Sequence, residues 1–130
     1  MKINNDNKAD NVKYSVIELT NDKELLGRMN DPSGASCLKG PCGDEMEFYL
    51  DIEDNIIKDI KYYTEGCEAT KACGVLAARM AKNKTLENAL CISAGEIMKN
   101  IKDLPEANSH CPILAVSSLY RAIADYLLKI

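Results

Sequence analysis

Three cysteines of this chain stand where a thiol can reach a metal ion or accept a sulfur atom. Cys42 lies in the segment Gly-Pro-Cys-Gly-Asp at residues 40–44. Proline fixes one backbone angle there and the glycines allow a tight path, so the loop presents its thiol rather than burying it. Cys67 follows a glycine, and Cys111 stands between a histidine and a proline. We expect these thiols to converge on one metal or sulfur site.

Two neighbouring side chains extend this candidate site. Asp44 and His110, the only histidine of the chain, can both bind metal. Cys67 and Cys111 each fall at a predicted helix start, where free backbone amides and the helix dipole favour a thiolate. Three sulfur ligands with a harder oxygen or nitrogen ligand suit zinc, or an iron-sulfur cluster that is held less firmly than by four cysteines. The predicted metal ligands are therefore Cys42, Asp44, Cys67, His110 and Cys111.

Each of these residues also has an ordinary structural explanation. The cysteine spacing matches no compact zinc motif and contains no CxxC pair. A lone cysteine is commonly a small buried hydrophobe, and an aspartate often serves only in a turn. Cys73, on an apolar helical stripe, and Cys91, after a leucine, are expected in the core. Cys37, in the loop before Cys42, is expected to be exposed, and Cys37 and Cys73 are candidate accessory thiols.

The composition narrows the class of protein. The chain has 130 residues, 46% hydrophobic and 28% charged, which is ordinary for one soluble globular domain. A net charge of −4 without a basic run argues against nucleic-acid binding. The N-terminus has no apolar stretch, so we expect neither a membrane span nor an export signal. Six cysteines without an export signal indicate a cytoplasmic protein, whose thiols more often bind metal or catalyse than form disulfides.

The first third of the chain gives the weaker structural signals. Residues 1–11 are mostly polar and are expected to form a flexible N-terminal arm, followed by a single domain over residues 12–130. The apolar residues of segment 12–19 fit a strand or a helix equally well. Residues 23–26 are expected to form a short capped helix, and residues 33–40 a loop or a short edge strand.

The remainder of the chain predicts a hairpin. Residues 45–52 alternate between apolar and polar side chains, which is typical of a half-buried strand. After a polar turn, residues 56–64 resume with Ile56, Ile60 and Tyr62 on one face. The two segments together predict an antiparallel hairpin.

Helical spacing then replaces strand spacing. The apolar residues recur with helical period from Cys67 onward, and Thr85 and Ser93 have the spacing of helix caps. The helix after Ser93 is expected to end at Leu104-Pro105, and Pro112 suits the first turn of a last helix. The predicted fold class is therefore α+β, a small antiparallel sheet with helices packed on one face.

Several short motifs, each weak alone, occur together in a characteristic order over most of the chain. They are Pro41-Cys42-Gly43-Asp44, Gly66-Cys67, Lys84-Thr85-Leu86-Glu87, Leu104-Pro105, His110-Cys111 and Ala122-Ile123-Ala124-Asp125-Tyr126. With these motifs the chain resembles the IscU-like and NifU N-terminal family of iron-sulfur cluster assembly scaffolds. Their combination is specific to that family.

The resemblance implies a non-enzymatic scaffold. Such a protein accepts sulfur from a cysteine desulfurase, takes up iron, assembles a cluster transiently and delivers it to recipient apo-proteins. The expected cluster is of the 2Fe–2S type, and zinc can stand in for iron. The resemblance also implies roles by position: Cys42, Cys67 and Cys111 bind the cluster, Asp44 keeps it transferable, His110 is an alternate ligand, and Cys111 accepts the sulfur.

One departure from the family pattern bears on partners. In the family, an Hsp70-type chaperone recognises a Leu-Pro-Pro-Val-Lys segment. The corresponding segment of this chain is Leu104-Pro105-Glu106-Ala107-Asn108. The second proline and the lysine are missing, so dependence on such a chaperone is doubtful. Two other functions stay open at this point: a zinc-bound sulfur acceptor that stimulates a desulfurase without carrying a cluster, and a thiol oxidoreductase, against which the absence of CxxC speaks.

Overall fold

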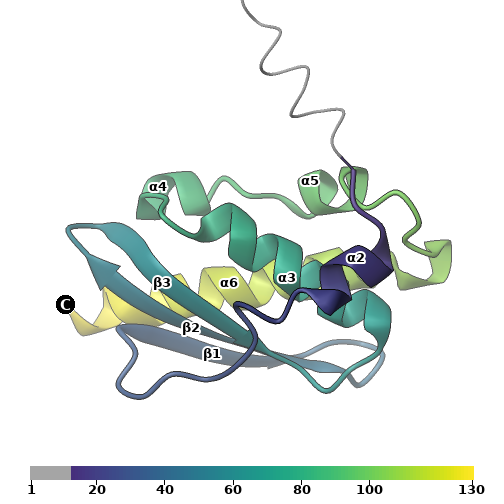
Figure 1. The fold of residues 1–130 in the computed structure, drawn as a ribbon. Coiled ribbons are helices and arrows are strands. Elements are labelled where there is room, and N and C mark those ends of the chain that lie inside the picture. Colours follow the sequence, from purple (N-terminus) through teal and green to yellow (C-terminus); the bar gives the residue numbers. More distant parts are fainter. Residues whose placement is uncertain (1–12) are drawn as a thin grey trace, which may run out of the picture.

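A three-stranded antiparallel sheet carries helices on one of its faces in the computed structural model, which describes residues 13–130. Helices α3 and α6 cover that face, and α4 and α5 lie on the side of these two helices away from the sheet (Figure 1). The predicted α+β architecture, a small antiparallel sheet with helices on one face, is therefore confirmed. The predicted N-terminal arm, residues 1–11, lies outside the described residues.

The elements follow one another in a simple order. They are α2 (Val16–Asn21), β1 (Gly34–Lys39), β2 (Glu45–Glu53), β3 (Ile56–Tyr63), α3 (Glu68–Ala81), α4 (Leu86–Ala89), α5 (Ala94–Lys99), the short 3-10 helix η1 (Glu106–Asn108) and α6 (His110–Lys129). The predicted caps are present, because the hydroxyl of Thr85 accepts a hydrogen bond from the amide of Asn88 and Ser93 forms a capping box with Glu96.

The predicted hairpin is formed by β2 and β3, with β2 as the central strand of the sheet. The alternation in β2 buries Met46, Phe48 and Leu50 completely beneath the helices. In β3 the prediction was wrong at one position. The register shifts by one residue at Asp51/Ile52, so Ile57 and not Ile56 enters the core. A β-bulge of this kind moves the following side chains to the opposite face.

The predicted helix at residues 23–26 is not formed. This segment runs beside β3 instead, where the amide of Tyr62 donates to the carbonyl of Leu25 at 3.0 Å and the amide of Gly27 donates to the carbonyl of Tyr62 at 2.9 Å. Backbone groups that pair with a strand cannot also form helical hydrogen bonds. The helix of this region is α2, which begins earlier, after the capping box of Ser15. Of the ambiguous segment 12–19, Val16–Leu19 are therefore helical, Tyr14 forms an isolated bridge with Ile101, and residue 12 lies outside the described residues.

Helix α5 also ends earlier than predicted, at Lys99 rather than at Leu104-Pro105. The next residue, Asn100, accepts a hydrogen bond at its carbonyl from the amide of Tyr14, and the carbonyl of Tyr14 accepts one from the amide of Lys102; both distances are 2.9 Å. This pairing with the segment before α2 competes with a further helical turn. The chain therefore approaches α6 as a connection rather than as a helix.

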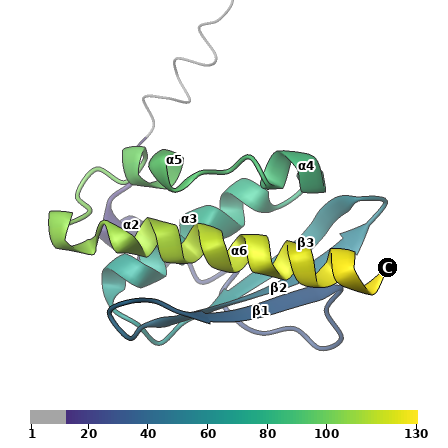
Figure 2. The ribbon, with the colours of Figure 1, turned by 180° about the vertical axis from the view of Figure 1, so that it is seen from behind.

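Helix α6 is fixed to the sheet by its buried polar side chain, Ser118. Its hydroxyl donates to the carbonyl of Met46 at 3.1 Å, and its carbonyl accepts from the hydroxyl of Ser36 at 2.7 Å. Figure 2 shows α6 running along the sheet from the opposite viewpoint. By length and composition the segment Glu106–Lys129 is apolar enough to cross a membrane, but half of its apolar 18-residue stretch is buried within the protein, as expected for a core helix.

The approach of α6 to β1 leaves no room for a side chain at Gly34, since an added Cβ would lie 2.3 Å from the carbonyl oxygen of Ala122. We expect Gly34→Ala to lower the free energy of unfolding by about 1–3 kcal/mol, because backbone atoms must shift. Urea denaturation measures this change. Gly95→Ala is the matched control: its added Cβ meets nothing closer than 3.7 Å, and alanine favours a helix. Equal midpoints for the two variants would contradict the prediction.

Candidate metal and sulfur site

Three connections of the fold meet at one end of the sheet. Because the strands are antiparallel, the β1–β2 loop and the last residue of β3 lie at the same end of the sheet, where α3 and α6 both begin. This end of the sheet is opposite the C-terminus of the chain (Figure 1). The hydroxyl of Thr64 links two of the connections, donating to the carbonyl of Glu45 at 2.5 Å and accepting from the amide of Gly66 at 3.0 Å. Every candidate ligand lies on one of these connections or at a helix start beside them.

The loop that carries Cys42 is a tight turn. The amide of Gly40 donates to the carbonyl of Asp44 at 2.8 Å, and the amide of Gly43 donates back to the carbonyl of Gly40 at 3.0 Å. Gly43 has a φ of 94°, a conformation that favours glycine. An added Cβ on Gly40 would lie 3.2 Å from a methyl group of Leu114, so the loop rests directly on α6. Cys42 itself is exposed, as the sequence predicts.

Asp44 connects this loop to the start of α3. Its Oδ2 accepts a hydrogen bond from the hydroxyl of Thr70 at 2.7 Å and a longer one from the backbone amide of Cys67 at 3.3 Å. The hydrogen bond from Thr70 is the main reason that the pKa of Asp44 is lowered, with smaller contributions from the Cys67 amide and from the thiols of Cys67 and Cys42. Asp44 is therefore a carboxylate whose oxygen is already directed toward the cysteines.

Cys67 and Cys111 approach each other from the starts of two helices. Cys67 is the N-cap residue of α3 and is exposed, whereas Cys111 lies in the first turn of α6 and is fully buried. Both sulfur atoms lie 3.3 Å from the hydroxyl oxygen of Thr70. Burial raises the pKa of the Cys111 thiol above its ordinary value. One thiol of this pair is thus open to solvent and the other is covered.

The segment before α6 contributes the remaining polar groups. The side-chain amide of Asn108 donates weakly to the sulfurs of Cys67 and Cys111, at 3.9 and 3.8 Å. His110 is half-buried, and its Nε2 lies 3.8 Å from the sulfur of Cys111. Sequence reasoning did not single out Thr70 or Asn108. Their helical spacing was the available signal, because Thr70 follows Cys67 by three residues and Asn108 precedes Cys111 by three.

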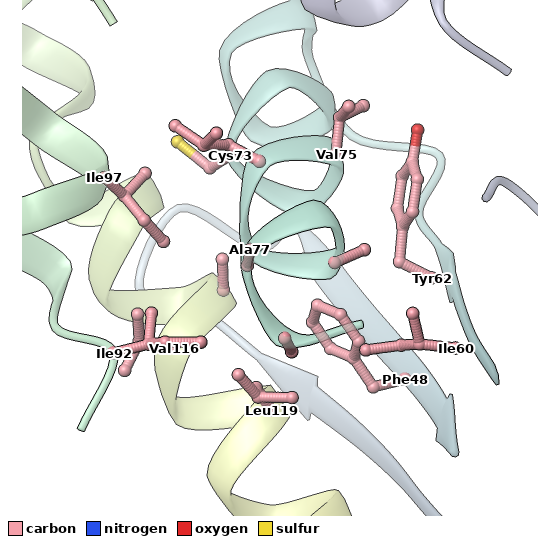
Figure 3. Close-up of a cluster of buried hydrophobic side chains, with 14 of the residues drawn as sticks. Phe48, Ile60, Tyr62, Cys73, Val75, Ala77, Ile92, Ile97, Val116 and Leu119 are labelled. Carbon is pink, nitrogen blue, oxygen red and sulfur yellow. The ribbon is translucent and has the colours of Figure 1, made fainter. Parts of the chain in front are cut away.

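Within residues 13–130, no hydrogen bond links the other three cysteines to this group. Cys37 is exposed on β1, as predicted, and its sulfur lies 3.9 Å from a carboxylate oxygen of Glu45. Cys73 is fully buried in the core, as predicted; burial raises its pKa, and its side chain lies on the side of α3 that faces Ile97 (Figure 3). The prediction for Cys91 was wrong. Helix α4 spans a single turn and ends before it, which leaves Cys91 exposed.

The donor types at this site suit a metal or an iron-sulfur cluster, since thiol, carboxylate and imidazole are ligands of zinc and of such clusters. Within residues 13–130, however, no group of three or more His, Cys, Asp and Glu side chains is close enough to enclose a single ion. The hydroxyl of Thr70 lies between the carboxylate and the two thiols instead. Binding would therefore require small side-chain movements toward a common centre.

Comparison with known proteins adds independent information. Residues 12–130 match the family model for the NifU-like N terminal domain. The chain is 41% identical over 105 residues to the iron-sulfur cluster assembly scaffold protein IscU 1 of Archaeoglobus fulgidus, covering 80% of this chain and 69% of that protein. It is 39% identical over 106 residues to the scaffold protein IscU of Haemophilus influenzae, covering 80% and 83% of the two chains.

Solved structures with a similar fold have lower sequence identity. The N-terminal part of a nitrogen-fixing NifU-like protein from Brucella abortus superposes with a TM-score of 0.74 at 16% identity, covering 88% of this chain and 93% of that one. A scaffold protein of the SUF system from Fervidobacterium islandicum superposes with a TM-score of 0.70 at 20% identity, covering 83% and 93%. At these identities the likeness establishes the fold alone.

The arrangement of Asp44 can be tested without removing any candidate ligand. An added Cβ on Gly66 would lie 2.6 Å from Asp44 Oδ2, so Gly66→Ala should displace the carboxylate from Thr70 and from the Cys67 amide. Because these hydrogen bonds lower the pKa of Asp44, we expect its pKa to rise toward the ordinary value in the variant, measured by carbon-13 NMR of the carboxyl group.

The lowered pKa of Asp44 also determines how the stability of the protein changes with pH. A lowered pKa in the folded state stabilises the protein at pH values above the ordinary aspartate pKa, and this contribution is lost as the pH falls through the folded-state pKa. The Gly66→Ala variant should therefore lose less stability than the unmodified chain as the pH falls through this range. Gly95→Ala serves as the control. An unchanged Asp44 pKa in a folded Gly66→Ala protein would contradict this description of the site.

Proposed function

Because this chain belongs to the family of NifU-like N-terminal domains, we propose that it is a non-enzymatic scaffold on which an iron-sulfur cluster is assembled transiently. The cluster is the cargo of such a protein rather than a permanent cofactor. The observation that carries the proposal is the meeting of Asp44, Cys67 and Cys111 around the hydroxyl of Thr70, although these residues are far apart in sequence. The scaffold names of the relatives support it.

The proposed ligands are Cys42, Cys67 and Cys111 with Asp44, and His110 is the alternate ligand. Cys42 and Cys67 are exposed, so the site is open toward solvent on the side where a cluster would enter and leave. Cys42 lies on a short loop, which can follow a cluster more easily than a helix can. An aspartate in place of a fourth cysteine would hold iron less firmly than thiolate does, which suits a carrier that must release its cargo.

We propose that a cysteine desulfurase supplies the sulfur and that recipient apo-proteins accept a 2Fe–2S cluster, in the cytoplasm. Sulfur acceptance at Cys111 would require neighbouring side chains to move, among them Asn108, whose amide contacts the sulfur, because this thiol is fully covered in the structure. The replacement of the family's chaperone segment by Leu104-Pro105-Glu106-Ala107-Asn108 supports transfer without an Hsp70-type chaperone. Zinc is the proposed occupant when iron is absent, because the same donors suit it.

Anaerobic reconstitution with iron and sulfide tests the scaffold function. We expect the full chain to develop visible sulfur-to-iron charge-transfer bands, and we expect Cys42→Ala, Cys67→Ala and Cys111→Ala each to lose most of that absorbance. Cys91→Ser is the matched control, because this thiol is exposed but lies outside the site. Stoichiometric zinc binding with no cluster under these conditions would support the zinc-bound sulfur acceptor instead.

The proposed role of Asp44 makes a separate prediction. Asp44→Cys would offer four thiolates, the set that holds iron-sulfur clusters firmly. We therefore expect the reconstituted cluster of this variant to last longer and to pass more slowly to an apo-ferredoxin. The decay of the variant's visible absorbance measures both rates. Asp51→Cys, on the exposed side of β2, controls for the added thiol. Transfer from Asp44→Cys as fast as from the unmodified chain would refute this role of Asp44.

A further inference from the structure

Thr70 is a fully buried polar residue that neither the sequence motifs nor the family resemblance assigns to the site. It lies in the first turn of α3, and its side chain has no exposed surface. A threonine inside a helix commonly returns its hydroxyl to the carbonyl of the preceding turn. In this protein the hydroxyl oxygen is instead 2.7 Å from Asp44 Oδ2 and 3.3 Å from the sulfurs of both Cys67 and Cys111.

The hydrogen-bonding capacity of a hydroxyl fixes how these contacts are made. It has one proton to donate and two lone pairs to accept with, whereas an ionised carboxylate can only accept. The proton of Thr70 therefore goes to Asp44, at the short distance typical of a hydrogen bond to a charged oxygen. The lone pairs of the hydroxyl are then free to accept from the thiols that lie 3.3 Å away, from Cys111 and from Cys67 whenever the Cys67 proton is not directed to Asp44.

These partners come from three separate parts of the fold. Asp44 stands between β1 and β2, Cys67 caps α3, and Cys111 opens the last helix, α6. The 3.3 Å between the hydroxyl oxygen and each sulfur is longer than a zinc–sulfur bond, which is about 2.3 Å. The hydroxyl nevertheless occupies the point on which the carboxylate and the thiols converge.

We propose that Thr70 is a positioning residue: it holds Asp44, Cys67 and Cys111 around one point before metal binds, and it releases both sulfurs when they bind metal. This inference rests on the proposed function, because it concerns the same site. The physical reason is pre-organisation. Side chains that are already held near their bound positions lose less conformational freedom on binding, which strengthens binding without adding a contact to the metal.

The experiment compares Thr70→Val with Thr70→Ser in the full chain under anaerobic conditions, with Co(II) alone as the probe. Valine keeps the shape of threonine but removes the hydroxyl, whereas serine keeps the hydroxyl. Sulfur-to-cobalt charge-transfer absorption reports thiolate coordination, and titration against a chelator gives the dissociation constant. We expect Thr70→Val to weaken Co(II) binding by about 10-fold to 100-fold, as is typical for groups that orient metal ligands, and Thr70→Ser to restore most of the affinity.

Two controls separate positioning from folding. Thr20→Val removes another buried hydroxyl, one that donates to the carbonyl of Ile17 within α2, and should leave Co(II) binding unchanged. Urea denaturation establishes that each variant is folded, and Thr70→Ala replaces Thr70→Val if the valine variant is not. A readout without metal is the pKa of Asp44, which should rise in the valine or alanine variant and stay low in the serine variant, because Thr70 is its main hydrogen-bond donor.

The outcomes distinguish this inference from the proposed function. Co(II) binding that is equally tight in the unmodified chain and in folded Thr70→Val would overturn the positioning role while leaving the scaffold function intact. Equal weakening in the serine and valine variants would also overturn it, since the hydroxyl would then not be the cause. An unmodified chain that shows no thiolate-to-cobalt absorption would instead refute the proposed function itself.

Discussion

The close packing of α6 against β1 determines where the candidate ligands lie. A glycine at position 34 lets the helix approach so near that an added Cβ would touch the carbonyl oxygen of Ala122 at 2.3 Å, and Ser118 ties the same helix to both β1 and β2. Because α6 cannot slide along the sheet without breaking these contacts, its first turn stays beside the β1–β2 loop. Cys111 and Asp44 therefore come within reach of the same hydroxyl although they lie on different elements.

The site combines rigid and adaptable parts. Cys67 and Cys111 are fixed at the starts of helices whose buried residues belong to the core, whereas Cys42 lies on an exposed turn. The two helix-start thiols also differ in accessibility, since Cys67 is open to solvent and Cys111 is covered. This asymmetry agrees with the proposed carrier function, in which the helices would keep the ligands together and the exposed turn would give access for loading and release.

Several structural features differ from what the local sequence pattern predicts. Ile56 was predicted in the core from simple alternation, but a bulge in the hairpin brings Ile57 there. The helix predicted at residues 23–26 is replaced by backbone pairing with β3. Cys91 was predicted to be buried because it follows a leucine, but the helix before it ends after one turn. In the first two cases pairing between backbone segments overrode a local pattern.

The amino-acid sequence by itself determined the fold class, the hairpin, the caps of the later helices and the residue types of the site, because these follow from apolar periodicity, turn chemistry and short motifs that are local in the chain. Only the tertiary structure decided that Thr70 stands among Asp44, Cys67 and Cys111 and that Cys111 is covered. Those facts depend on the distance between helices α3 and α6 at their first turns. That distance is set by side-chain packing between elements, which no local pattern records.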